Sequence, residues 1–295
     1  MSVTAAVNAV QSRLNAIAVE KTRSWWTNYV KGACFRGVNM AGVRKTVHAV
    51  HKELDLASLT PNQRLELFST LLSQDMTEDK MAGIIYAHEV MLPQREPDWN
   101  EGISEVSRLF SQGFVADWNT CDWLCVKVLG NLVKQHGESC YRAISDWRFA
   151  GSLWQRRASC VAFVNLAKMG DAGNFTGFTD MLLENCEQLI SAGPDERFAQ
   201  TGAGWVLREL GQVDRAHVVD LLKRRAGLLS LEGLRYATEK MPVSEQKRLK
   251  AHHQRANAMA LRYGQDYQEG ARQDGQEDSP AEQRGQKRRR RVKRC

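Results

Sequence analysis

Apolar residues recur along the chain at the three- and four-residue spacing of amphipathic helices, and the alternation typical of strands is nearly absent. The pattern therefore predicts an all-α fold. Ser or Thr residues that suit helix starts support it: Thr60, Thr77, Ser139, Ser152 and Ser244. The predicted helical segments are Val43–Leu54, Pro61–Ser73, Glu78–Met91, Asn100–Gln112, Asp122–Gln135, Leu153–Met169, Phe175–Ile190, Arg197–Leu210, Ala216–Arg224 and Leu231–Lys240.

These segments and their short connections make helix pairs that recur every 35 to 45 residues or so, the spacing of HEAT-like repeats. We therefore expect one HEAT-like helical-repeat solenoid over residues 1–262. Sequence identity between the repeats is weak, and a generic helical array would show the same pattern.

The composition changes after Tyr263, where apolar residues become rare and the chain ends in the run KRRRRVKR at Lys287–Arg294. We expect residues 263–295 to form a disordered, basic tail. Pro242–Cys295 holds 14 Lys and Arg against 7 Asp and Glu, so the whole excess of the net charge of +7 lies there. The basic run has three interpretations: a nuclear-import signal in a eukaryotic source, a non-specific DNA tether, or a solvated tail.

Several classes of protein are disfavoured. The longest apolar runs fall far short of the roughly 18 residues of a membrane span, and the N-terminus lacks the apolar core of a signal peptide. We expect an intracellular protein, nuclear if the source is eukaryotic and cytoplasmic otherwise. The seven cysteines show no C-x-x-C pair and no matching histidine cluster, so we expect no metal site and a reducing compartment.

Four segments carry the candidate chemistry: Tyr29 to Asn39 with its F-R-G-V-N turn, W-N-T-C-D at 118–122, L-W-Q-R-R-A at 153–158, and G-W-V-L-R-E at 204–209. In this order and spacing they resemble the AlkD-type family of DNA alkylation-repair glycosylases, over about residues 25 to 240. The G-W-x-L-R-E segment is the most specific of the four, and W-x-x-x-D alone the least. At the first segment the chain departs from the family pattern, because Asn39 stands where Gln is usual and one residue closer to Tyr29.

The resemblance implies a monofunctional glycosylase that excises alkylated purines from duplex DNA, needs no cofactor, and lacks the deep pocket of base-flipping enzymes. It assigns the catalytic role to Asp122, flanked by Trp118 and Trp205. Candidate DNA contacts are Arg157, Tyr29, Asn39, Arg156, Lys31 and Arg208. We expect the chain to act as a monomer.

Elementary chemistry supports Asp122 independently. A purine alkylated at N3 or N7 is a cation and already a good leaving group, so the enzyme must chiefly stabilise the positive sugar that develops as the bond breaks. A carboxylate does this by attraction and by positioning a water molecule. Trp118 lies four residues earlier, on the same helical face, and aromatic faces attract cations. No lysine stands out for a Schiff base, so we expect no strand cleavage.

Each residue also has a structural interpretation. An aspartate near a helix start often serves as a cap, and tryptophans are core residues by default. Arg157 could contact a phosphate, or hold a carboxylate such as Asp122 and favour its ionised form. Arg208 stands beside Glu209, which favours an ion pair. The alternative function is a non-catalytic HEAT-like scaffold that binds nucleic acid or protein.

Overall fold

The computed structural model describes residues 2–95 and 98–274, with side chains through Met259. Within these ranges the fold is all-α, apart from an isolated β-bridge between Cys34 and Met76. The helices are α1 Val3–Ala16, α2 Glu20–Tyr29, α3 Met40–Glu53, α4 Pro61–Leu72, α5 Thr77–Tyr86, α6 Trp99–Ser111, α7 Trp118–Leu124, α8 Gly130–His136, α9 Glu138–Ser145, α10 Leu153–Val161, α11 Val164–Ala167, α12 Phe178–Ser191, α13 Arg197–Leu210, α14 Arg215–Arg224, α15 Leu231–Thr238 and α16 Val243–Asp274. The predicted all-α helical-repeat fold is confirmed.

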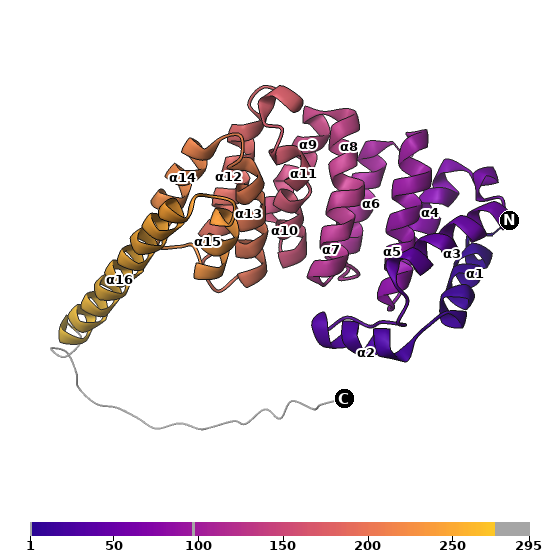
Figure 1. Cartoon of the computed structure of the whole chain (residues 1–295), viewed down its shortest axis with the longest axis horizontal. Coiled ribbons are helices and arrows are strands. Elements are labelled where there is room, and N and C mark those ends of the chain that lie inside the picture. Colours follow the sequence, from indigo (N-terminus) through magenta and orange to yellow (C-terminus); the bar gives the residue numbers. More distant parts are fainter. Residues whose placement is uncertain (1, 96–97, 275–295) are drawn as a thin grey trace.

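The helices are arranged in two rows that form an arc (Figure 1). One row runs through α3, α5, α7, α10, α13 and α15, and each of these helices contacts the next. From α5 onward they begin about 35 to 45 residues apart, as a helical repeat requires. The second row packs behind it and contains α1, α4, α6, α9, α12 and α14. A continuous apolar core fills the space between the rows, from Leu14 in α1 to Leu221 in α14.

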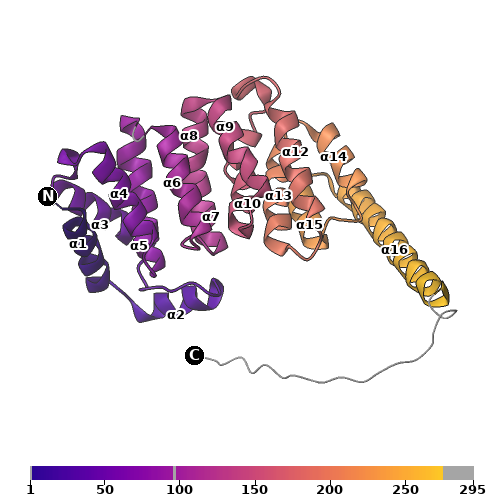
Figure 2. The same ribbon diagram turned by 180° about the vertical axis from the view of Figure 1, so that it is seen from behind.

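Helices α2 and α16 depart from the two rows. Figures 1 and 2 show α2 along one side of the arc, near its N-terminal end, and α16 leaving the body at the other end. No predicted helical segment covers α1, α2, α9 or α16, although Ser139 and Ser244 indicated helix starts for the last two. For α2 the reason is physical: none of its residues is buried, so it carries no apolar stripe.

Helix α16 continues past Tyr263 to Asp274, whereas we expected disorder from residue 263. The basic run Lys287–Arg294 lies outside the described residues.

The capping signals locate the helix starts to within two residues. Thr60 caps α4 in a capping box with Gln63, and Ser152 caps α10 by accepting from the backbone N–H of Gln155. Thr77, Ser139 and Ser244 are expected caps that instead lie inside their helices, at the first position of α5 and at the second position of α9 and α16. A short polar side chain near a helix start therefore indicates the turn and leaves the boundary open by one or two residues.

None of the helices that the structure describes is long and apolar enough to cross a membrane. Within the same residues, no group of three or more His, Cys, Asp and Glu side chains is placed to hold a metal ion.

Candidate active site

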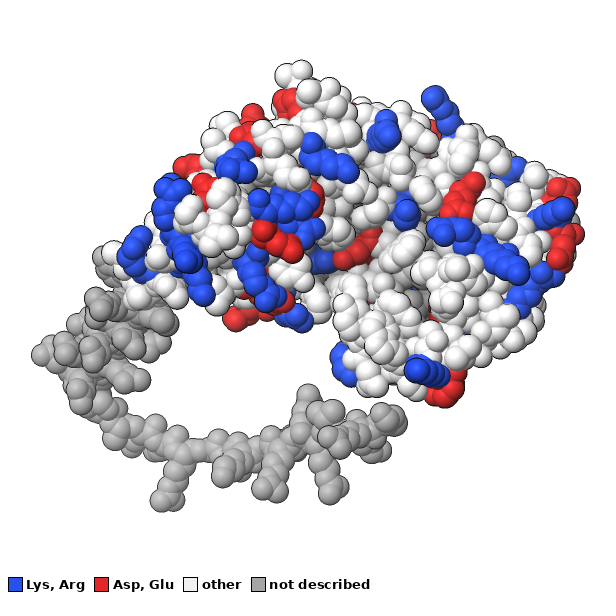
Figure 3. All heavy atoms as spheres, viewed as in Figure 1, with Lys and Arg blue, Asp and Glu red and all other residues white. Residues whose placement is uncertain are grey.

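An open cleft of about 400 Å³ lies on the row of helices that contains α7, α10, α13 and α15. Six of the predicted site residues line it together: Tyr29, Trp118, Asp122, Arg157, Trp205 and Arg208. A second cleft of about 310 Å³ shares Trp118, Asp122 and Trp205. The surface is hollowed between α2 and the C-terminal part of the arc (Figure 3). Trp205, which is distant in sequence from Trp118 and Asp122, therefore meets them on one accessible face.

Asp122 and Arg157 form a two-pronged ion pair across α7 and α10. Nε and Nη2 of Arg157 each donate to a different carboxylate oxygen of Asp122, both at 2.8 Å. The Arg157 side chain is 6% exposed and that of Asp122 is 15% exposed, so the pair is largely desolvated but the carboxylate still reaches the cleft. Burial alone would lower the pKa of Arg157, but attraction and hydrogen bonds from Asp122 raise it above its ordinary value.

The surrounding helices fix this pair. Asp117 caps α7 by accepting the backbone N–H of Thr120 at 2.8 Å, which places Asp122 in the following turn. Arg157 also donates through Nη1 to the carbonyl of Phe198 at 2.6 Å, at the start of α13. Gly202 of α13 leaves the space that Arg157 occupies, since an added Cβ would lie 3.0 Å from Nη1. Three helices thus hold one carboxylate in one orientation.

Aromatic rings extend from the cleft onto α2. Tyr29 lines the cleft and meets Trp118 edge to face, with ring centroids 5.5 Å apart and planes at 87°. Trp25 stacks on Tyr29 at 5.0 Å, and both of these side chains are 57% exposed. Exposed, mutually supported rings of this kind offer flat faces to a base or a sugar.

The F-R-G-V-N turn explains where α2 lies. The buried carboxylate of Glu78, on α5, accepts the backbone N–H groups of Arg36, Gly37 and Val38 at 2.8, 2.8 and 3.0 Å. Gly37 has φ of +100°, and a Cβ there would come within 2.3 Å of the Val19 carbonyl, so only glycine fits. The Gly37 carbonyl in turn accepts the N–H of Val19, just before α2 begins. Glu78 therefore anchors the loop that positions the aromatic helix.

A second glycine explains the G-W-V-L-R-E segment. Gly204 faces the backbone of α15, and a Cβ on it would lie 2.5 Å from the carbonyl oxygen of Gly233. The close approach of α13 to α15 therefore depends on this glycine. Trp205, the next residue, is half-buried and lines both clefts.

The candidate DNA contacts occupy different environments. Lys31 lies just past the end of α2, is exposed, and contacts the side-chain oxygen of Asn28 at 3.5 Å. Asn39 caps α3 by accepting the N–H of Gly42, which explains an amide side chain there without DNA. Arg156 is held by Glu196 at 2.6 Å and by the carbonyls of residues 150 and 151. Arg157 takes the second of its two expected roles, as the partner of Asp122.

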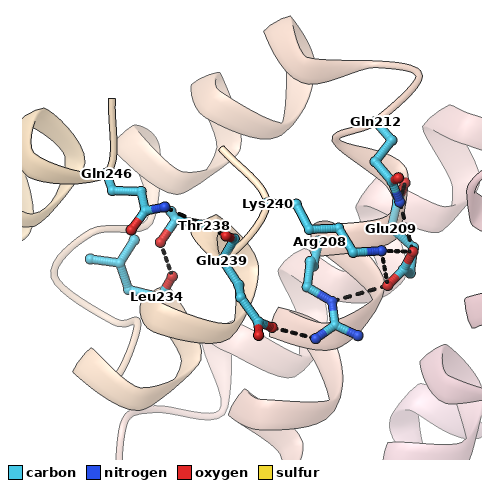
Figure 4. Close-up of polar contacts among 8 residues, drawn as sticks. All are labelled: Arg208, Glu209, Gln212, Leu234, Thr238, Glu239, Lys240 and Gln246. Atoms are coloured by element: carbon cyan, nitrogen blue, oxygen red, sulfur yellow. Dashed lines mark hydrogen bonds and ion pairs between the residues drawn. The ribbon is translucent and has the colours of Figure 1, made fainter. Parts of the chain in front are cut away.

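Arg208 lines the cleft, but its guanidinium belongs to an ion-pair network that joins α13 to the end of α15 (Figure 4). It donates to Glu209 at 3.0 Å and to Glu239. Lys240 donates to the same Glu209 carboxylate at 2.7 and 3.0 Å. Burial alone would raise the pKa of Glu209, but Lys240 and Arg208 lower it below its ordinary value. The ion pair favoured by the neighbouring Glu209 is thus present, and it weakens the case for Arg208 as a phosphate contact.

Sequence reasoning missed several residues of the clefts. Phe198 and Tyr236 line the first cleft from α13 and α15. Trp123 and Lys127 line the second, with the Lys127 ammonium 5.8 Å from the Trp123 ring centroid. The position of Trp123, directly after Asp122 in the chain, could have drawn attention to it.

Comparisons with known proteins place this chain in a family. The family model described as DNA alkylation repair enzyme matches residues 10–241, which is most of the chain. The chain belongs to this family. A solved structure of a predicted DNA alkylation repair enzyme from Enterococcus faecalis superimposes with a TM-score of 0.61, at 20% sequence identity. The alignment covers 77% of this chain and 97% of that protein, which shows a shared fold. The comparison with curated proteins gave no match.

Proposed function

We propose that this member of the DNA alkylation repair family is a monofunctional glycosylase that acts as a monomer on duplex DNA. Its substrates are cationic purines such as N3-alkyladenine and N7-alkylguanine. The observation that carries the proposal is the carboxylate of Asp122, fixed by Arg157 and exposed to a cleft that Trp118 and Trp205 also line. Membership of the family supports a role in alkylation repair.

The reaction needs one bond broken and one formed. As the bond between C1′ and the purine nitrogen breaks, its electron pair passes to the base and cancels the base's positive charge, while positive charge develops on the sugar. The carboxylate of Asp122 attracts that charge and orients a water molecule. The water oxygen then bonds to C1′ and loses a proton, which leaves a free base and an abasic sugar.

Arg157 contributes by orientation. Because both carboxylate oxygens are held at 2.8 Å, the plane of the Asp122 carboxylate is set before substrate arrives. Such preorganisation removes the need for the site to rearrange during the reaction. The indoles of Trp118 and Trp205 add faces whose negative quadrupoles favour a nearby cation.

The test is base release from defined duplexes. We expect the protein to release 7-methylguanine and 3-methyladenine as free bases, to leave uracil in a matched duplex untouched because that base is neutral, and to leave strands uncut. Asp122→Asn, purified in parallel, controls for contaminating glycosylases. Excision of uracil at a rate similar to that of 7-methylguanine would contradict the dependence on a cationic base. Preferential binding of the lesion without any release would favour the non-catalytic scaffold.

A further inference from the structure

Helix α16 lies beyond the part of the chain that the family model matches. The match ends at residue 241, and α16 begins at Val243 and runs to Asp274. A helix of this length extends roughly 45 to 50 Å, and it projects from the end of the arc in Figures 1 and 2. Helix α16 is therefore an addition to the repeat domain that the family model matches.

The first turns of α16 are fixed to the body. Leu249 and His253 are buried, and Nε2 of His253 lies 2.8 Å from the carbonyl oxygen of Leu229. Nε2 of the neighbouring His252 lies 3.2 Å from the carbonyl oxygen of Lys223, near the end of α14. At the start of the helix, Gln246 donates to the carbonyl of Met241 at 2.8 Å. Side chains on this part of α16 consequently have defined positions relative to α14.

A basic groove of about 420 Å³ lies between α14 and α16. Lys223, Arg248, His252 and Arg255 line it, and Glu245 is the one acidic residue of its wall. Among the ion pairs of the described residues, none involves Lys223, Arg248 or Arg255, and all three side chains are exposed.

The neighbouring arginines behave differently. Arg224 pairs with Asp220 and Glu187 at 2.8 Å, and Arg225 pairs with Glu187 at 2.6 Å. Arg215 approaches Glu245 at 4.0 Å. Within the described part of the chain, Lys223, Arg248 and Arg255 therefore differ from these arginines in forming no ion pair with a carboxylate. Three uncompensated cations on a fixed framework suit a ligand with several negative charges.

We propose that this groove between α14 and α16 binds the phosphodiester backbone of duplex DNA beside the lesion. The inference rests on the proposed function for the identity of the polyanion. Lys and Arg side chains gather over the C-terminal part of the arc in Figure 3, next to the hollow that separates this part from α2. Figures 1 and 2 show α16 at the opposite end of the arc from α2. A duplex held at Asp122 would extend toward α16, where Lys223, Arg248 and Arg255 neutralise phosphates and release counterions.

The experiment measures binding of the full chain to an undamaged duplex as a function of salt. The test variant replaces the groove cations by glutamine (Lys223→Gln, Arg248→Gln and Arg255→Gln). A matched control removes three exposed lysines for which the structure shows no ion pair (Lys52→Gln, Lys134→Gln and Lys168→Gln). Each phosphate contact contributes about 0.9 to the slope of log K against log salt, so the test variant should lose about 2 to 3 from that slope and the control much less.

A second readout separates this inference from the proposed glycosylase activity. At saturating enzyme, single-turnover release of 7-methylguanine should be unchanged in the test variant, because its cleft is intact. An unchanged salt slope in the test variant, or an equal loss in the control, would overturn the groove proposal. Binding to undamaged DNA does not require catalysis, so the salt slopes decide the matter even if the wild type releases no base.

Discussion

Gly202 offers a way to disturb the catalytic geometry without changing any group that could react. A Cβ at this position would lie 3.0 Å from Nη1 of Arg157, 3.2 Å from its Cγ and 3.3 Å from Cγ2 of Val161. Ordinary contacts between such atoms are about 3.5 to 4.0 Å, so Gly202→Ala should move the guanidinium by roughly 0.5 Å. The carboxylate of Asp122 is bonded to that guanidinium through both oxygens and should move with it.

The expected loss of rate follows from the size of this displacement. A misplacement of about 1 Å can cost about a hundredfold in rate, so a shift of half that size should slow base release about tenfold. The free energy of unfolding should fall by about 0 to 2 kcal/mol, because alanine gains about 1 kcal/mol over glycine inside a helix and crowding costs about 1 to 3 kcal/mol.

The assay is single-turnover release of 7-methylguanine from a duplex, accompanied by thermal unfolding. Gly227→Ala is the matched control, since a Cβ at Gly227 would meet nothing within 4 Å. We expect the wild-type rate for Gly227→Ala and about a tenth of it for Gly202→Ala. Wild-type release by a folded Gly202→Ala protein would refute the idea that the position of Arg157 matters to catalysis.

Two further predictions concern the supports of the site. Glu78→Gln should destabilise the fold by about 3 kcal/mol and slow base release. The reason is that an amide cannot accept all three backbone N–H groups of residues 36–38. An unchanged melting temperature would contradict the anchoring role of Glu78. The lowered pKa of Glu209 means that its stabilising effect is full above the ordinary value of 4.5 and is lost as pH falls through the folded-state value. At pH 7 the Glu209→Gln protein should therefore unfold at a lower urea concentration than wild type. The difference between the two unfolding midpoints should shrink at pH 3.5. A constant difference would show that the ionisation of Glu209 does not contribute to stability.

Much of the fold was predictable because it depends on local patterns. Helical periodicity and the spacing of helix pairs indicated a helical repeat, and the four motifs indicated that Trp118, Asp122 and Trp205 would share a surface. Whether Arg157 faces DNA or Asp122 could not be decided, since the answer depends on how deeply α10 packs against α7 and α13. Helix α2 was missed because a helix without buried residues has no apolar stripe to detect.

The lining of the two clefts was predicted only in part. Trp123 and Lys127 meet at the ordinary four-residue spacing of a helix, but no motif connects this pair with the reaction. Phe198 and Tyr236 were missed because they reach the first cleft from helices distant in sequence and lie in no motif pointing to the reaction.

The central claim is that the negative charge of residue 122 drives base loss. It is tested most directly by the rate at saturating enzyme, with duplex affinity measured separately. Glu232→Gln is the matched control, because it makes the same carboxylate-to-amide change on a residue of the same cleft that pairs with Arg197 instead. For Asp122→Asn we expect release of 7-methylguanine to fall about 10² to 10³-fold with near-normal duplex binding, and for Glu232→Gln a nearly normal rate. Equal rates for Asp122→Asn and the wild type would contradict the claim.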